Sequence, residues 1–543
     1  MNVSLFYPPL VLPSLDTPYP SLPLLCAYLK ENSSHEVSCI DLNVEFIHDL
    51  IKLSRANGKK FRYPPAPRSA THDISRIRRF RAKPLFKKAR DVVKRLLDRR
   101  YMSMDEVEYL TIEGLKLLFV DLSIDIETFR QLRSNDSETV STHYLLDYWN
   151  LTHDQLNTII EDNNGLSIFE FLGSEYFRET SENEPFVAGI SVAFFTQFGA
   201  AISLAKHLKK LNPSTFVVIG GPVIRHVSRN FTTSINLFDV VDCFVETEGE
   251  DILVELLDHL EAGRDWRNTP GVIYRSHNDE VVKQPPQPYD VNKNSLPDYA
   301  LIDQHTYREP RTLFLRTSKG CYWDKCAFCT QSLNTYQHRS IEHIAGDIQE
   351  LAVRYGAKKI IFSDEAVALP RLSKLADVLI ERDSPVEWVS YTRFDATISD
   401  SVFAKLKRAG CAGLIFGLES ACQRVNNLMN KGVNVENASK IIGACRKVDL
   451  FYGIGAIIGF PGETEAEMLE TVNFLKKHLN GKKCWGYISI FSLNYGSRVF
   501  RHPEEFGITS IESAEEYIYK ESYSFTCDNQ VPYARMMEIR DML

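Results

Sequence analysis

The sequence lacks several features that would each assign it to a large class of proteins. No apolar run approaches 18 residues, so we expect no membrane span. The formal charge is −8, from 63 Lys and Arg against 71 Asp and Glu, which argues against electrostatic capture of nucleic acid. The N-terminus carries Pro8, Pro9 and Pro13 without a basic leader, a poor pattern for a signal peptide. The odd count of 11 cysteines does not suggest a disulfide framework. We therefore expect a cytoplasmic protein that binds neither membrane nor nucleic acid.

What is present is a strand and helix alternation in two parts of the chain. In the first part, residues 1–261, apolar runs with amphipathic helices between them predict parallel strands. Glycine-rich turns follow two of these runs, at Gly220-Gly221 and at Gly249, where the backbone could approach a ligand at the ends of the strands. We predict a doubly wound, Rossmann-like α/β domain. Its expected strands are 3–7, 37–42, 186–194, 216–219 and 238–245.

Two stretches depart from this pattern. Residues 65–180 show mostly helical periodicity, and 75–100 hold 12 Lys or Arg against two Asp, with apolar residues interleaved. We predict a helical insertion with a solvated basic face; a docking surface for an acidic or peptide partner is the alternative. Residues 262–311, rich in Pro, Asn and Asp, predict a linker with a small hairpin at 271–282.

The second alternation covers residues 312–500 and indicates a partial (β/α)6 barrel. We expect a helical segment at 501–543 after it. The six expected barrel strands are 313–316, 359–362, 387–391, 413–416, 452–458 and 485–491.

Three cysteines follow the first expected barrel strand within nine residues: Cys321, Cys326 and Cys329. A closed zinc site usually needs four ligands, and no second cysteine or histidine pair lies nearby. A four-iron cluster held by only three thiolates would keep one iron open to substrate. The spacing therefore favours a catalytic iron–sulfur centre over a structural metal. The other cysteines, Cys26 and Cys39 among them, are expected to be buried small hydrophobes.

This loop resembles the cluster loop of the radical S-adenosylmethionine (SAM) enzymes, although its first gap is one residue longer than the usual C-x3-C-x2-C. The resemblance implies a [4Fe-4S] cluster on Cys321, Cys326 and Cys329, with SAM bound to the open iron. Motifs in the family's order follow the later strands, although Ser363-Asp364-Glu365 lacks the glycines usual at that point. By this resemblance, SAM would be bound by Phe328, Ser363, Asp364, Glu365, Arg393, Glu419, Gly459 and Pro461.

The first domain resembles the cobalamin-binding domain of the B12-dependent subclass of that family. It has no Asp-x-His-x-x-Gly motif, which members of the subclass commonly lack. A degenerate domain that no longer binds the corrin is the alternative. By the resemblance, the cobalamin residues would be Pro8, Asn43, Gly220, Gly221, Glu248 and Gly249.

The two resemblances together imply a reaction class. We expect cleavage of SAM to a 5′-deoxyadenosyl radical and cobalamin-dependent C-methylation of an unactivated carbon in a metabolite or peptide. Two alternatives stay open: cobalamin-independent epimerisation, cross-linking or ring closure, and a non-catalytic metal-binding module. An external electron donor such as flavodoxin or ferredoxin is expected. The sequence identifies neither the substrate nor a catalytic side chain.

Overall fold

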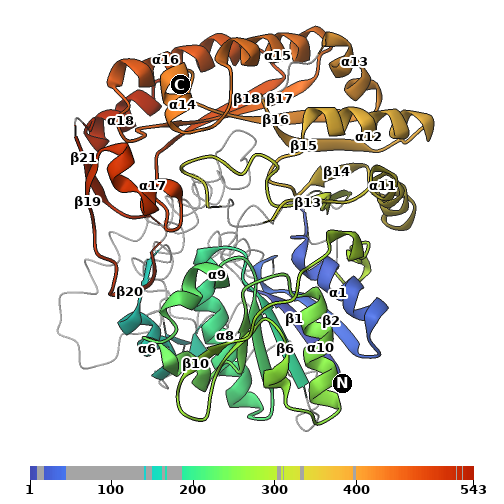
Figure 1. Cartoon of the computed structure of the whole chain (residues 1–543). Helices are drawn as coiled ribbons and strands as arrows, with labels where there is room; N and C mark the ends of the chain where they lie inside the picture. The colour runs from blue at the N-terminus through green and yellow to red at the C-terminus, as the bar shows by residue number, and fades with distance from the viewer. Residues whose placement is uncertain are drawn as a thin grey trace, which may run out of the picture.

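The computed structural model consists of two α/β layers that face each other, the N-terminal one below and the C-terminal one above in Figure 1. No helix in the described part of the chain is long and apolar enough to cross a membrane. The structure describes residues 1–8, 17–44, 140–141, 150–161, 166–167, 186–302, 307, 309, 311–330, 335–394, 399–520, 522–528 and 530–543.

The first domain is built on a seven-stranded sheet in the order β10-β9-β8-β7-β6-β1-β2. The chain runs from β1 to β2 on one side and returns to β6 on the other, so the strand order reverses beside β1. A ligand crevice is expected at such a reversal, at the carboxyl ends of the strands. The five parallel strands are β1 (Asn2–Tyr7), β2 (Glu36–Asp41), β6 (Phe186–Ser191), β7 (Phe216–Gly220) and β8 (Cys243–Val245).

Helices complete this doubly wound domain and confirm the predicted α/β fold. All six residues of β6 are buried, as expected for a parallel strand covered on both faces. The helices of this domain are α1 (Ser21–Asn32), α8 (Phe198–Leu211), α9 (Ile224–Val227) and α10 (Glu250–Glu261).

The expected hairpin at 271–282 forms, but not in a free linker. Strands β9 (Val272–Arg275) and β10 (Val281–Lys283) are antiparallel and extend the first sheet beyond β8. This part of the expected linker therefore belongs to the first domain. Without β9, the strand β8 would be the edge of the sheet and would leave backbone groups unpaired. Pairing with β9 satisfies these groups.

The second domain is a six-stranded parallel sheet in chain order, which confirms the predicted partial barrel. Helices lie between consecutive strands, because apolar residues recur at helical spacing in these segments. The strands are β11 (Thr312–Leu315), β14 (Lys359–Phe362), β15 (Glu387–Arg393), β16 (Cys411–Glu419), β17 (Phe451–Ile458) and β18 (Cys484–Ile490). The helices are α11 (Ile341–Tyr355), α12 (Leu369–Glu381), α13 (Asp400–Arg408), α14 (Gln423–Leu428), α15 (Val435–Lys447) and α16 (Glu465–His478).

The C-terminal segment differs from the predicted helical one. It holds three short strands before its last helix: β19 (Ile508–Ile511), β20 (Tyr517–Lys520), β21 (Phe525–Cys527) and α18 (Tyr533–Arg540). Strand β20 pairs with β4 (Asn150–Thr152), and its buried Tyr519 packs on Phe195 and Phe198 of the first domain. The strand depends on a partner far away in the sequence, so local periodicity could not reveal it.

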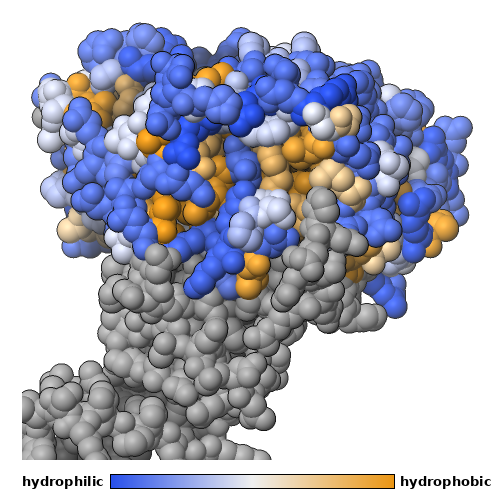
Figure 2. Space-filling view, turned by 90° about the horizontal axis from the view of Figure 1, so that it is seen from below, coloured by the Kyte–Doolittle hydropathy of each residue, from blue (hydrophilic) through white to orange (hydrophobic). Residues whose placement is uncertain are grey.

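Most of the predicted 65–180 insertion lies outside the described residues. Its described part includes β4 and the helix α6 (His153–Glu161), beside the short strands β3 (Val140–Ser141) and β5 (Leu166–Ser167). Cys26 on α1 and Cys39 on β2 form a disulfide, so the expectation that both are simply buried small hydrophobes is wrong for this pair. Figure 2 shows the molecule from below: hydrophilic residues cover much of its described surface and separate smaller apolar patches.

Candidate functional site

The three cysteines lie in one loop at the carboxyl end of β11. Two short antiparallel strands, β12 (Ser318–Lys319) and β13 (Gln337–His338), close the loop at its base. All three cysteines lie outside any disulfide and are partly exposed. Among the described residues, no three His, Cys, Asp or Glu side chains gather as the ligands of one metal ion would. The loop thus offers three accessible thiols, one fewer than a closed zinc site uses.

The middle of this loop is held by the barrel. The indole Nε1 of Trp323 donates to the carbonyl of Asn430 at 2.9 Å, and the amide of Ala327 donates to the carbonyl of Met429 at 2.8 Å. The amide of Val499 in turn donates to the carbonyl of Ala327 at 3.0 Å. These contacts fix the backbone around Cys326.

Two cations surround the thiol of Cys326. The Arg393 guanidinium lies 3.9 Å from its Sγ and 4.6 Å from the centre of the Trp323 ring, and it also donates to the carbonyl of Lys431. Burial raises the pKa of Cys326, while the charges of Lys431 and Arg393 act in the opposite direction. Cationic neighbours favour thiolates, the form that binds iron. The residues around the loop therefore fit an iron–sulfur cluster.

The expected SAM residues divide into two groups in the structure. Ser363 and Glu365 line a cavity at the mouth of the barrel. Asp364 between them is buried and accepts hydrogen bonds from the amide of Thr317 at 3.1 Å and from the hydroxyl of Ser318 at 2.5 Å. Its carboxylate therefore fixes the start of the cysteine loop.

Glu419 and Phe328 meet at one lysine. Glu419, at the end of β16, has a left-handed backbone with φ of 62° and forms an ion pair with Lys431 at 2.6 Å. The same ammonium group lies 5.8 Å from the centre of the Phe328 ring. Lys431 thus brings Glu419, Phe328 and Arg393 into one group beside Cys326.

The turn after β17, which contains Gly459 and Pro461, is organised by a buried carboxylate. Glu463 Oε2 accepts from the amides of Gly459 at 2.6 Å and Phe460 at 3.1 Å. Burial raises the pKa of Glu463 to about 7, against the effect of these two hydrogen bonds. Sequence reasoning missed this residue.

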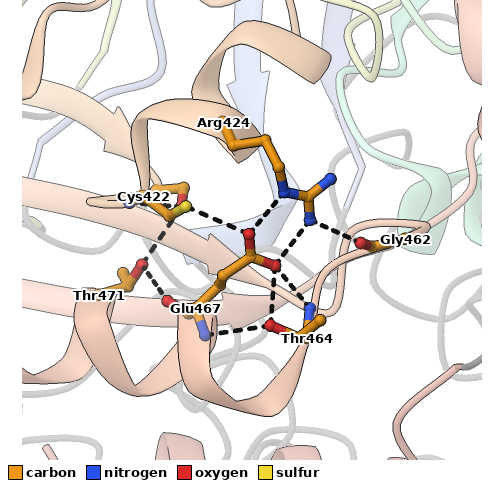
Figure 3. Close-up of polar contacts among 7 residues, drawn as sticks. Cys422, Arg424, Gly462, Thr464, Glu467 and Thr471 are labelled. Carbon is orange, nitrogen blue, oxygen red and sulfur yellow. Dashed lines mark hydrogen bonds and ion pairs between the residues drawn. The ribbon is translucent and has the colours of Figure 1, made fainter.

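A second network fixes the same turn from outside (Figure 3). Arg424 donates to both carboxylate oxygens of Glu467 at 2.6 Å and to the carbonyl of Gly462 at 2.7 Å. Glu467 also accepts from the amide of Thr464 at 2.9 Å, which forms a capping box at the start of α16. The spacing Thr464-x-x-Glu467 is a signal that could have revealed this network.

A cavity of about 670 Å³ lies between the two domains. Of the expected cobalamin residues, Gly220, Gly221, Glu248 and Gly249 line it, at the carboxyl ends of β7 and β8. Pro8 and Asn43 are not among its lining residues. The Pro8 carbonyl accepts from Gln197 at 2.6 Å, and the Asn43 side chain is fully buried.

The glycine at 221 shows why the floor of this cavity is bare backbone. Its φ is +109°, and a Cβ there would lie 2.3 Å from the carbonyl oxygen of Val192. Only glycine tolerates both the conformation and the close approach. The bare turn therefore lets a ligand approach the backbone at the ends of the strands.

Aromatic residues that sequence reasoning missed line the cavity near the barrel. The Tyr19 ring stacks on Tyr7 with 5.0 Å between centroids and lies 5.8 Å from Phe194. Burial, helped by the nearby charge of Glu365, raises the pKa of Tyr19 to about 12. No spacing in the sequence marks Tyr19, because its role depends on the contact between the domains.

Comparisons with known proteins agree with this geometry. Residues 315–475 match the model of the Radical SAM superfamily. The uncharacterized methyltransferase PH0819 of Pyrococcus horikoshii is 30% identical over 307 residues, which cover 54% of this chain and 64% of that protein. The chain therefore spans less than two thirds of this curated relative.

Two solved structures share the architecture. The radical SAM methyltransferase TsrM from Kitasatospora setae, with tryptophan substrate and a SAM analogue bound, superposes with a TM-score of 0.58 at 14% identity and covers 99% of this chain and 88% of that one. The cobalamin-dependent SAM radical enzyme OxsB, with aqua-cobalamin and SAM bound, gives 0.58 at 13% identity and covers 99% of this chain and 66% of that one. At these identities the similarity shows the fold.

Proposed function

We propose that this chain, which belongs to the radical SAM superfamily, is an enzyme that cleaves SAM and uses cobalamin to methylate an unactivated carbon of its substrate. The observation that carries the proposal is the shared cavity. Its lining includes Gly220 and Gly221 from the first domain, and Lys319 and Gly320, which directly precede Cys321, from the second. A ligand on the glycine turns would therefore face the start of the cysteine loop. When bound, the cluster supplies an electron that breaks a carbon–sulfur bond of SAM, and cobalamin supplies the methyl group.

The residues of the chain have three tasks in this scheme. Cys321, Cys326 and Cys329 would hold the cluster, and the cations of Arg393 and Lys431 keep positive charge beside it. Ser363, Glu365, Glu419 and the turn at Gly459–Pro461 would bind SAM, because they follow the strands that surround the cysteine loop. The glycine turns would seat the corrin.

The position of the cavity between the two domains suits radical chemistry. Aromatic side chains from the first domain cover one side of it, and the barrel covers the other. Exclusion of water protects a reactive intermediate from side reactions. The substrate, a metabolite or a peptide, would enter where the two domains meet, and an external donor such as flavodoxin or ferredoxin would deliver the electron.

Reconstitution with iron, sulfide and hydroxocobalamin under anaerobic conditions tests this proposal. We expect bound cobalamin and, with SAM and a reductant, both 5′-deoxyadenosine and S-adenosylhomocysteine by mass spectrometry. If 5′-deoxyadenosine forms alone and no cobalamin is retained, the enzyme is a cobalamin-independent radical SAM enzyme. A colourless protein that forms neither product would overturn the proposal altogether.

A further inference from the structure

The start of the cysteine loop is tied to the first domain and its end to the segment that joins the two domains, although its middle is held by the barrel. At the start, Lys319 Nζ lies 2.6 Å from Glu248 Oε2 in the turn after β8. At the end, Gln337 Nε2 donates to the carbonyl of Tyr289 at 2.8 Å, and Gln337 Oε1 accepts from the amide of Val291 at 3.1 Å. Lys319 and Gln337 face each other across the β12–β13 pair. The residue pair at the base of the loop is therefore attached to the first domain through Lys319 and to the joining segment through Gln337.

Glu248 pairs with two cations of the barrel domain. A second cation, Arg316, lies 3.5 Å from its other carboxylate oxygen. The Glu248 and Lys319 side chains are only 16% and 14% exposed, so water screens their pairing less than it screens a surface pair. Burial acts to raise the pKa of Glu248, but the hydrogen bond and charge of Lys319 outweigh it and lower this pKa.

The attachment continues into the first domain behind Glu248. Lys319 Nζ also lies 5.4 Å from the centre of the Tyr289 ring. The hydroxyl of Tyr289 donates at 3.1 Å to the carboxylate of Glu250, which is the first residue of α10. The same few side chains thus connect α10 with the base of the cysteine loop.

This network also forms part of the cavity wall. Glu248, Glu250, Arg316, Lys319 and Gly320 all line the cavity, and Gly320 precedes Cys321 directly. A ligand that fills the cavity must lie against the ion pair and limit its movement. By the family resemblance of the sequence, Glu248 was expected to contact the corrin. In the structure its carboxylate pairs with two cations of the other domain.

We propose that Glu248 is a positioning residue that couples occupancy of the inter-domain cavity to the position of the cysteine loop. The inference rests on the proposed function, since it takes cobalamin as the occupant. Binding of the corrin orders Glu248, and through Lys319 and Arg316 it orders the backbone that carries Cys321. Such coupling would keep the iron–sulfur chemistry idle until cobalamin is in place.

Hydrogen exchange measured by mass spectrometry on anaerobic, cluster-loaded protein tests this coupling. In the wild type, saturating hydroxocobalamin should slow exchange of the amides at 316–330 by about 5-fold or more. In E248Q and in K319M the slowing should fall below about 2-fold, with cobalamin kept saturating according to the affinity measured for each variant. The double variant should lose no more than either single one, because both remove the same contact.

The controls separate this inference from its premise. D377N removes an ion pair on the surface of the barrel, in which Asp377 lies 2.8 Å from Lys405. This variant should respond to cobalamin as the wild type does. A wild type that takes up no cobalamin contradicts the proposed function before any variant is made. If cobalamin binds to E248Q and still slows the exchange of these amides 5-fold, the positioning role is wrong. If E248Q cannot bind cobalamin at all, Glu248 is a corrin ligand, which also overturns the inference.

Discussion

The two walls of the inter-domain cavity are built on different principles. The barrel side presents chemically distinctive side chains: Arg316, Lys319 and Glu365 line the cavity, and Gly320 in its lining leads directly into the cysteine loop. The wall of the first domain presents bare backbone at Gly220 and Gly221 and apolar or aromatic surface, and it bears the carboxylates of Glu246, Glu248 and Glu250 beside the second turn. Side chains of the first kind act through their identity, whereas turns of the second kind act through their shape. Loss of one thiol and loss of one glycine should therefore impair the protein in different ways.

The largest effect is expected on the barrel side, in the cysteine loop. Cys326→Ala removes one of three thiols for the cluster, so iron content and 5′-deoxyadenosine formation should fall by about 100-fold or more, because two thiolates hold a cluster poorly. Cobalamin uptake, measured by absorbance, should stay close to that of the wild type.

A matched control lies outside the loop. Cys527→Ala replaces another free and partly exposed cysteine and should leave iron content unchanged. Retained SAM cleavage in Cys326→Ala would show that the loop does not hold the cluster and that the barrel side does not act through its thiols.

The next effect tests the backbone wall. Gly221→Ala places a Cβ 2.3 Å from the Val192 carbonyl oxygen at a φ of +109°, so the turn must move. We expect a loss of about 3 kcal/mol in unfolding free energy. Cobalamin affinity should fall while the iron content of the barrel stays unchanged. Urea titration and absorbance measure the two quantities.

Gly263→Ala is the control for conformation without a clash. Its φ is +62°, and no atom lies within 4 Å of the added Cβ. The expected cost is about 1 kcal/mol, with no change in cobalamin affinity. Equal effects of the two substitutions would mean that the close approach at Gly221 is unimportant.

This contrast explains which parts of the molecule could be predicted from the sequence. Periodicity revealed both α/β domains, because each buries its own apolar faces. The cysteine loop was evident because three thiols at short spacing are rare and act through local chemistry. The strand β20 and the cavity residue Tyr19 were missed, since both depend on segments that meet only in the folded chain.

Role assignments by position were less secure than the positions themselves. Asp364 stands where a SAM ligand was expected, yet its carboxylate accepts hydrogen bonds from Thr317 and Ser318. Glu248 was expected to contact the corrin, yet it pairs with Lys319. A motif indicates which turn is involved, but only the tertiary contacts show which atom is already bonded.

An effect of similar size, seen only as a change with pH, concerns Glu463, a barrel side chain that holds a backbone turn. Burial raises its pKa from 4.5 to about 7, so the folded state binds the proton more tightly than the unfolded state. Its contribution to stability is therefore complete below about pH 4.5 and is lost as the pH rises through about 7. Glu463→Gln removes this dependence. The unfolding free energy of the variant minus that of the wild type should grow by about 3 kcal/mol from about pH 4.5 to about pH 8.

Urea unfolding across this pH range is the measurement, and Glu465→Gln is the matched control. Glu465 is exposed, two residues further on, and its pKa is lowered by its hydrogen bond to Arg535. Its variant should show no such growth. A flat difference for Glu463→Gln would mean that the turn after β17 is fixed by its backbone alone, as the turns of the first domain are.

The smallest effect comes from the outer network of the same turn. Arg424→Met removes the ion pair with Glu467, whose pKa the Arg424 hydrogen bond lowers to about 2. The guanidinium is 54% exposed, so solvent screening limits the loss to about 1 kcal/mol at neutral pH. That loss should vanish as the pH falls from about 4.5 through about 2, because protonated Glu467 no longer attracts the cation. Lys447→Met breaks the more exposed pair with Asp400 and should cost less than about 0.5 kcal/mol by urea titration. If the two variants are equally mild, the bidentate geometry around Gly462 adds nothing, and this turn is held from within by Glu463.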